Sequence, residues 1–207
     1  MRKKSVAIIG KGPSVKKCSK TFIDKFDTIV ACGRPIFNNK YEKYIGNRVH
    51  YDYANRTSTP YTKEEGKRLG LIRTIDTGSG SPVRESFKYK DLDPSTGILA
   101  FHEYVTNSEF DKISLIGFDL FQVDNRMYYF DNDEFDLSVK WLWEDGAYDK
   151  DGNLTKISGH NTELTYEYLM SMIDLYPEKM FHIISSYTFE KRKNLVLQWI
   201  YGQIQKH

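Results

Sequence analysis

Short apolar runs recur along this chain, with helical stretches between them, and they limit the possible folds more than any other feature. The first, SVAIIG, covers Ser5 to Gly10, and the second, DTIVAC, covers Asp27 to Cys32. Both are rich in β-branched residues and both stop at a glycine. Runs that are apolar throughout are typical of parallel strands buried on both faces. Similar runs predict further strands within 47–55, 71–76, 112–119 and 179–185.

Helical patterns separate the expected strands. The segment after GKGPS reads as a helix or helical turn capped by Ser14, and a longer helix is expected from Ser95 to Asn107. Thr77 to Asp93 is rich in Gly and Pro and is expected to be a loop. Strands that alternate with helices predict an α/β protein with a mainly parallel sheet, as one domain over 1–207. The other expected helices lie within 40–46, 63–70, 160–176 and 188–207.

The segment 120–159 has no clear periodicity and is rich in Asp, Tyr and Trp. Segments of this length without regular structure are usually functional lids, binding loops or disordered, and aromatic residues argue against disorder. We expect a lid or binding loop. Trp141 and Trp143 lie two residues apart within it and either contact a ligand or anchor the lid to the core.

Composition excludes several classes of function. The formal net charge is +2, which gives no support for nucleic-acid binding. No apolar run is long enough to span a membrane, and the N-terminus lacks a signal-peptide pattern. Two cysteines fit a reducing, cytoplasmic compartment, although a disulfide stays open. Peripheral contact of the last segment with the inner face of a membrane, and assembly into an oligomer, are open alternatives.

Three motifs stand where strands end, which is the ligand-binding edge of a parallel sheet. GKGPS follows the first strand, and its Gly10 and Gly12 would let backbone approach a ligand. PSTG precedes a helix, where Ser95 or Thr96 acts as a cap or receives an anion. GFD ends the fifth strand, and Asp119 is a candidate acceptor for ribose hydroxyls or a simple turn residue. None of these is a P-loop or a GxGxxG fingerprint.

These pieces together resemble the sialyltransferases of glycosyltransferase families 29 and 42. The segments that carry the resemblance, in chain order, are VAIIGKGPSV, TIVAC, PSTGILAF, FDKISLIGFDLF and GHNTELTYEYL. PSTGIL is similar to a motif of the family 29 enzymes, whereas GFDLFQVDNRMYYFD and SGHNTE are closer to family 42.

The resemblance implies a Rossmann-like domain, a variant of the GT-A fold, that carries a lid. It implies inverting transfer of an acidic sugar, sialic acid or a Kdo-like sugar, from a CMP-sugar to a glycan hydroxyl without an essential metal or cofactor. The 120–159 lid would take part in acceptor binding, and Trp141 and Trp143 either stack on an acceptor sugar or anchor the lid to the core. The family's general base falls on His160, and a tyrosine that holds the leaving phosphate falls on Tyr128, or on Tyr129 if the register slips. The histidine's usual pKa near 6.5 suits that role.

The resemblance also assigns the donor pocket and shows departures. Ser95, Thr96 and Gly97 would hold the donor carboxylate, while Gly117, Phe118 and Asp119 would line the CMP pocket. Lys11 and Gly33 stand where the family has asparagine, and Phe121 stands where it has a second tyrosine, whereas an asparagine persists as Asn55. Lys11 could meet a phosphate and Arg34, beside Gly33, a carboxylate, so a different acidic sugar or nucleotide is compatible with this set.

Two alternatives remain. Asp131 and Asp133 form a D-x-D pattern that, in metal-dependent transferases, chelates a divalent ion on a UDP- or GDP-sugar. The missing tyrosine and asparagine donors also fit a catalytically inactive relative that binds a nucleotide or glycan.

Overall fold

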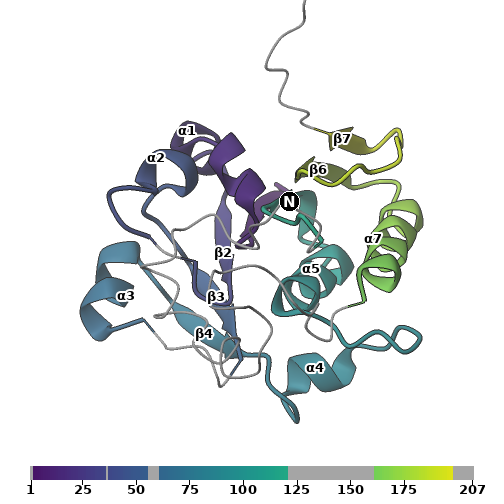
Figure 1. Ribbon diagram of the computed structural model, residues 1–207, viewed down its shortest axis with the longest axis horizontal. Coiled ribbons are helices and arrows are strands. Elements are labelled where there is room, and N and C mark those ends of the chain that lie inside the picture. Colours follow the sequence, from purple (N-terminus) through teal and green to yellow (C-terminus); the bar gives the residue numbers. More distant parts are fainter. Residues whose placement is uncertain (1, 36, 56–60, 121–160, 198–207) are drawn as a thin grey trace, which may run out of the picture.

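The computed structural model describes residues 2–35, 37–55, 61–120 and 161–197 (Figure 1). Its centre is a seven-stranded sheet in the order β4-β3-β2-β1-β5-β6-β7, and all neighbouring strands run parallel. The expectation of a Rossmann-like α/β fold is confirmed. The strands are β1 (Lys4–Ile9), β2 (Thr28–Cys32), β3 (Tyr51–Ala54), β4 (Arg73–Asp76), β5 (Phe110–Ile116), β6 (Met180–Ile184) and β7 (Leu195–Leu197).

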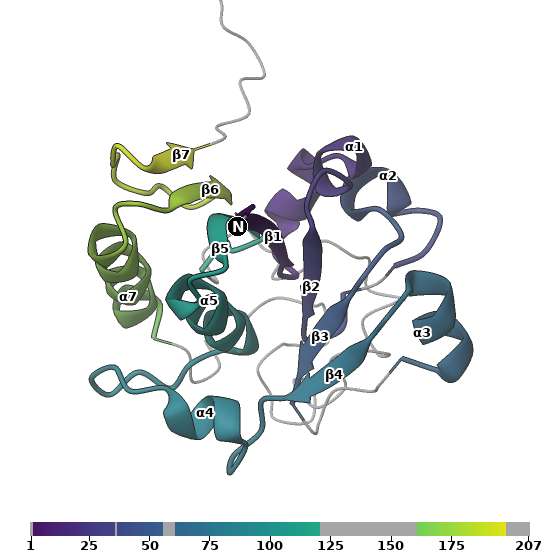
Figure 2. The same cartoon turned by 180° about the vertical axis from the view of Figure 1, so that it is seen from behind.

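Helices cover both faces of the sheet (Figures 1 and 2). Alternate residues of β1 point to opposite sides: Val6 and Ile8 pack with α5 and α7, whereas Ala7 and Ile9 pack with η1, α1, α2 and α3. Strands buried on both sides must be apolar throughout, which explains the continuous runs in the sequence. The helices are the 3-10 segment η1 (Pro13–Lys17), α1 (Lys20–Ile23), α2 (Glu42–Ile45), α3 (Lys63–Leu69), α4 (Pro82–Ser86), α5 (Thr96–Thr106) and α7 (Thr162–Leu175).

The strand order reverses between β1 and β5. Chain order runs from β1 outward to β4 on one side and from β5 outward to β7 on the other. The loops that follow β1 and β5 therefore leave in opposite directions, so a crevice at the carboxyl ends of the two strands is expected there. GKGPS and GFD are the two loops in question.

Two predictions of local structure were wrong. Thr77 to Asp93 is not entirely loop, because Ser81 caps the short helix α4, whose first position is proline. The closing helix expected over 188–207 is also absent from its described part, since β7 occupies Leu195–Leu197 beside β6.

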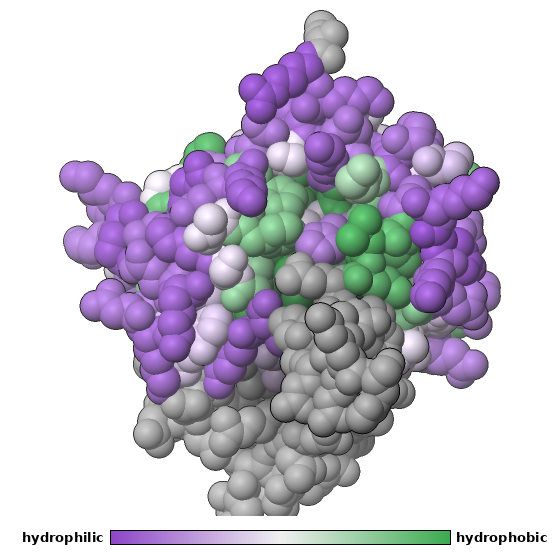
Figure 3. Space-filling model, turned by 90° about the horizontal axis from the view of Figure 1, so that it is seen from above, coloured by the Kyte–Doolittle hydropathy of each residue, from purple (hydrophilic) through white to green (hydrophobic). Residues whose placement is uncertain are grey.

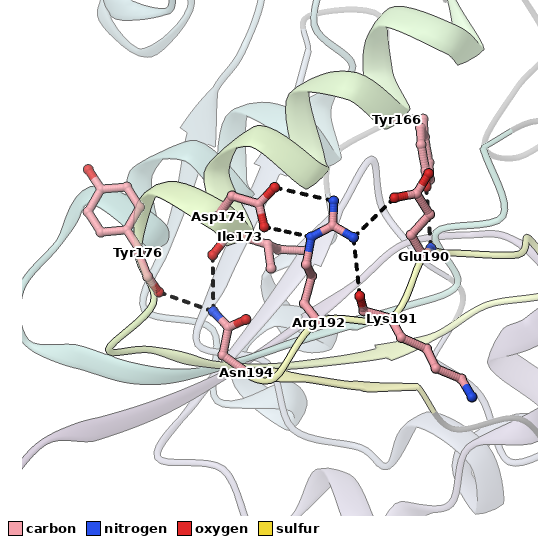
Figure 4. Close-up of polar contacts among 8 residues, drawn as sticks. All are labelled: Tyr166, Ile173, Asp174, Tyr176, Glu190, Lys191, Arg192 and Asn194. Atoms are coloured by element: carbon pink, nitrogen blue, oxygen red, sulfur yellow. Dashed lines mark hydrogen bonds and ion pairs between the residues drawn. The ribbon is translucent and has the colours of Figure 1, made fainter.

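Side-chain contacts to α7 account for β7 (Figure 4). Arg192 binds Asp174 of α7 through Nε at 2.7 Å, and Asn194 donates to the carbonyl groups of Ile173 and Tyr176 at 3.0 and 3.3 Å. The backbone N–H of Phe181 then donates to the Asn194 carbonyl at 2.8 Å. These long-range contacts hold the segment extended along β6, which its local sequence pattern cannot reveal.

The β6–β7 end of the sheet leaves apolar side chains in contact with solvent. Leu175, Met180 and Val196 are each half exposed or more. Figure 3 views this end and shows hydrophobic atoms between hydrophilic ones. Within the described residues, no helix is both long and apolar enough to cross the bilayer.

Candidate functional site

The loops after β1 and β5 meet at the point where the strand order reverses. The Gly10 N–H donates to the Ile116 carbonyl at 2.8 Å, and the Gly12 N–H donates to the Gly117 carbonyl at 3.0 Å. Gly117 in turn donates to the Ile184 carbonyl at 3.1 Å, which adds the end of β6. Backbone hydrogen bonds thus fix three loops that come from distant parts of the sequence.

Asp119 joins the same three loops through its side chain. Oδ2 accepts the backbone N–H of Ser14 at 2.8 Å, and Oδ1 accepts the Ser186 N–H at 2.5 Å and the Ser185 hydroxyl at 3.1 Å. The residue is 3 % exposed. Asp119 therefore organises the site from below its surface, and any contact with a ribose hydroxyl would add to these three bonds.

The glycines of GKGPS and GFD are explained by contacts within the protein. A Cβ on Gly12 would lie 2.4 Å from Asp119 Oδ2 and 2.6 Å from the Gly117 carbonyl oxygen, and one on Gly10 would lie 2.8 Å from that same oxygen. These contacts alone account for both glycines, and the prediction that they also let backbone approach a ligand stays a prediction. Ser14 is likewise not a helix cap, since Gly12 occupies the cap position and the Ser14 hydroxyl donates to the Ile184 carbonyl at 3.1 Å.

Replacing Gly12 by alanine should lower the free energy of unfolding by about 2–3 kcal/mol, because its Cβ would separate the two loops. The backbone of Gly12 is ordinary, with φ −63°, so the cost comes from contact rather than from conformation. Gly66→Ala is the matched control. Its Cβ would meet Leu71 at 3.6 Å inside α3, so this change should stabilise the protein by up to about 1 kcal/mol. Chemical denaturation of both variants measures the difference, and equal effects would contradict the assignment.

The PSTG turn lies against the GFD loop. Ser95 is the N-cap of α5 and its hydroxyl accepts the Ile98 N–H at 3.4 Å, so the capping prediction is confirmed for Ser95 and not for Thr96. A Cβ on Gly97 would lie 2.9 Å from two ring atoms of Phe118. The start of α5 therefore packs directly on the residue between Gly117 and Asp119. The N–H groups of a helix's first turn have no partner within the helix and attract anions.

Arg84 of α4 supports this turn from outside. Its Nη2 donates to the Pro94 carbonyl at 3.0 Å, its Nε donates to the Thr77 carbonyl at 2.9 Å, and it pairs with Asp93. The hydroxyls of Thr77 and Thr96 are 3.3 Å apart. The orientation of the PSTG turn is thus set by residues from the end of β4 and from α4.

The loop after β2 forms the opposite wall. Gly33 and Arg34 both have left-handed backbone, with φ of 68° and 55°. The Arg34 guanidinium group binds Glu65 of α3, with Nη2 at 3.0 Å from Oε2, and lies 5.2 Å from the centre of the Tyr61 ring. The carboxylate that Arg34 meets in the structure is therefore Glu65, and recognition of a donor carboxylate would use its remaining N–H groups.

Lys11 and Asp52 are two oppositely charged groups near this loop, and each shifts the pKa of the other. Burial lowers the pKa of Lys11 to about 8, partly offset by the neighbouring Asp52 carboxylate. Burial raises the pKa of Asp52 to about 6, partly offset by the Arg34 N–H and by Lys11. Asn55 follows β3 and is half-buried. The cysteines predicted to be reduced, Cys18 and Cys32, are both buried free thiols.

Most residues of the predicted donor pocket are described and follow the carboxyl ends of strands, whereas the predicted catalytic groups lie outside the described residues. The residues of this pocket that meet at the carboxyl edge are Gly10, Lys11, Gly12, Ser14, Gly33, Arg34, Asn55, Ser95, Thr96, Gly97, Gly117, Phe118 and Asp119. Apart from Leu120, the residues of the predicted 120–159 lid lie outside the described ranges, and so does His160. The predicted site residues among them are Phe121, Tyr128, Tyr129, Asp131, Asp133, Trp141 and Trp143. Within those ranges, no cluster of His, Cys, Asp or Glu is arranged to hold a metal ion.

Comparison with known proteins identifies the fold. No protein-family model matches the sequence, and no curated protein matches it. The structure of the sialyltransferase CstII from Campylobacter jejuni with the substrate analogue CMP-3FNeuAc matches with a TM-score of 0.60 at 14% identity, over 87% of this chain and 81% of that chain. The chain has the CstII fold.

A second CstII structure, a Tyr→Phe variant in complex with CMP, matches with a TM-score of 0.61 at 15% identity over the same shares of both chains. A mammalian sialyltransferase gives a TM-score of 0.36 at 12% identity, over 86% of this chain and 68% of that chain. The likeness to CstII confirms the resemblance to family 42 at the level of fold.

Proposed function

We propose that this protein is an inverting glycosyltransferase that transfers an acidic sugar, sialic acid or a Kdo-like sugar, from a CMP-sugar to a glycan hydroxyl without an essential metal. One observation carries the proposal: the PSTG turn packs through Gly97 on Phe118, at the edge where the loops after β1 and β5 meet. That edge is where sheets of this type bind nucleotides. The CstII fold supports the same conclusion, since one of the matching structures contains CMP.

The proposed chemistry assigns a task to each group. The first turn of α5, with the hydroxyls of Ser95 and Thr96, receives the donor's carboxylate, which the helix dipole favours. Lys11 and Tyr128 hold the phosphate. His160 takes the proton from the acceptor hydroxyl, whose oxygen attacks the anomeric carbon, and the bond to CMP breaks with its electron pair on the phosphate oxygen. Trp141 and Trp143 in the 120–159 lid contact the acceptor sugar.

A thermal-shift comparison of CMP, UDP and GDP, each with and without Mn²⁺, tests the nucleotide. CMP should raise the melting temperature without added metal, because a ligand at 100 times its Kd stabilises the folded state by about 2.7 kcal/mol. Lys11→Gln should reduce this shift, whereas Lys16→Gln on the exposed side of η1 should not.

Two other results would contradict the proposal. Stabilisation by UDP or GDP only when Mn²⁺ is present would favour a metal-dependent transferase that uses Asp131 and Asp133. CMP binding without transfer or donor hydrolysis, tested with CMP-sialic acid and CMP-Kdo, would favour an inactive relative.

A further inference from the structure

A buried carboxylate with an unpartnered oxygen lies below the proposed donor pocket. Asp52 of β3 is 1 % exposed, and its Oδ2 has no hydrogen-bond partner among the described residues. Its other oxygen, Oδ1, accepts the Arg34 N–H at 3.4 Å, a long bond. An unpaired buried carboxylate is costly in a protein interior, so a charged partner close by is expected.

The sheet brings Lys11 to this carboxylate. Ile9, Ala31 and Asp52 are in register across β1, β2 and β3 and share one face of the sheet. Lys11 follows two residues after Ile9, and its Nζ lies 3.3 Å from the place that a Cβ on Gly33 would take. The lysine side chain therefore reaches Gly33, which follows β2, the strand that pairs with β3. A side chain on residue 33 would obstruct that path.

We propose that Asp52 is a positioning residue, whose carboxylate holds the Lys11 ammonium group and the Gly33–Arg34 turn at the donor-binding edge and keeps Lys11 charged for an anionic ligand. This inference rests on the proposed function for the identity of the ligand. The Asp52–Lys11 contact itself can be tested without any ligand.

Among the described residues, Asp52 is the main anion that raises the pKa of Lys11. From β2, the Cys32 thiol has a pKa raised well above its usual value by burial, so it is neutral. Arg34 is paired with Glu65 of α3, and Asp119, on the β5 side, accepts three hydrogen bonds of its own. The pKa values of about 6 for Asp52 and about 8 for Lys11 define a range, between about pH 6 and pH 8, in which both groups are charged.

Amine labelling of the ligand-free protein tests the contact. Only the neutral amine reacts, so the extent of acetylation of Lys11 against pH, read by mass spectrometry, gives its titration. The midpoint should lie near pH 8 in the wild-type protein and should fall by about one pH unit in Asp52→Asn, because the neighbouring anion is lost. The profile of Lys16 in the same samples should not change. An unchanged Lys11 midpoint would overturn the proposal, whatever the protein binds.

CMP binding tests the consequence for the ligand. With its midpoint one pH unit lower, Lys11 would be about one-tenth protonated at pH 8 instead of one-half, so CMP affinity should fall several-fold there and much less at pH 6.5. Asp52→Asn should have no such pH-dependent effect in a Lys11→Gln background. If Asp52 merely repelled the phosphate, its replacement would tighten binding at both pH values. Absence of CMP binding by the wild-type protein would instead contradict the proposed function and leave the labelling result valid.

Folding of the variants is an informative control. Lys11→Gln/Asp52→Asn removes both charges together and leaves neither one uncompensated in the interior. If Asp52→Asn alone is unstable, the double variant should recover the wild-type melting temperature. If both are equally unstable, Asp52 supports only the Arg34 turn and the proposal is wrong.

Discussion

Asp119→Ala is expected to lower the free energy of unfolding by about 4 kcal/mol, or the melting temperature by about 10 °C. The carboxylate accepts three hydrogen bonds at a site that is 3 % exposed, and the donors belong to the loops after β1 and β6. Alanine would leave the buried N–H of Ser14 without an acceptor, which costs more than the bond contributes, and would also remove the acceptor of the Ser186 N–H. Calorimetry or urea unfolding measures the loss.

Asp27→Ala is the control with similar chemistry in a different setting. Asp27 also accepts a backbone N–H and a hydroxyl, both from Ser5, at 2.9 and 2.8 Å. Its side chain is 37% exposed, and it lies at the start of β2, the end of the sheet away from the site. Water can replace its bonds, so the variant should lose less than about 1 kcal/mol. A similar loss in both variants would show that Asp119 has no special role in joining the loops.

The effect of Asp119→Ala on CMP binding distinguishes two roles of Asp119, which are holding the loops in place and contacting the ligand directly. If Asp119 acts by holding the loops, Asp119→Ala should weaken CMP binding and stability together, and the stabilising change Gly66→Ala in the same chain should not restore affinity. If the carboxylate also binds a ribose hydroxyl, Asp119→Ala should weaken the binding of CMP more than the binding of 2′,3′-dideoxy-CMP, which lacks both ribose hydroxyls.

The sequence predicted the central strands β1 and β2 well because they are buried on both faces. Such a strand must be apolar at every position, and the runs at Val6 to Ile9 and Ile29 to Cys32 satisfy this without reference to the rest of the chain. The prediction of β7 failed for the opposite reason. Leu195 to Leu197 is short, lies at the sheet edge and is held by Arg192 and Asn194, whose partners on α7 are 18 or more residues away.

In the candidate site, too, the features with a local sequence signal were predicted and those set by long-range contacts were not. The motifs were visible because strand ends, glycines and a helix cap leave local signals, and the three stretches do meet. The sequence did not show which distant residues these motifs contact. Gly12 is required by Asp119, which lies 107 residues later, and Arg84 supports PSTG from a segment that was expected to be loop. Asp52 was missed because one aspartate inside an otherwise apolar strand gives no signal until its neighbours are known.

His160→Ala should reduce the rate of sugar transfer by about 10²–10⁴-fold and leave CMP binding unchanged. The proposed base acts on the acceptor hydroxyl and not on the nucleotide, so its loss should affect turnover and not donor affinity. In the wild-type protein, activity should rise with pH through about 6.5, as the imidazole loses its proton and becomes able to accept another. That rise should be absent from the residual activity of the variant.

His50→Gln is the matched control, because this histidine lies just before β3, at the opposite end of the sheet from the site. Its Nδ1 accepts the Ile29 N–H at 2.9 Å, and burial lowers its pKa, so the substitution should reduce stability without changing the pH profile of transfer. Full transfer activity in His160→Ala would remove the assigned base. Equal losses of CMP binding and transfer in that variant would mean that residue 160 helps to form the donor pocket, and the base would then have to be sought among the other residues of the 120–159 lid.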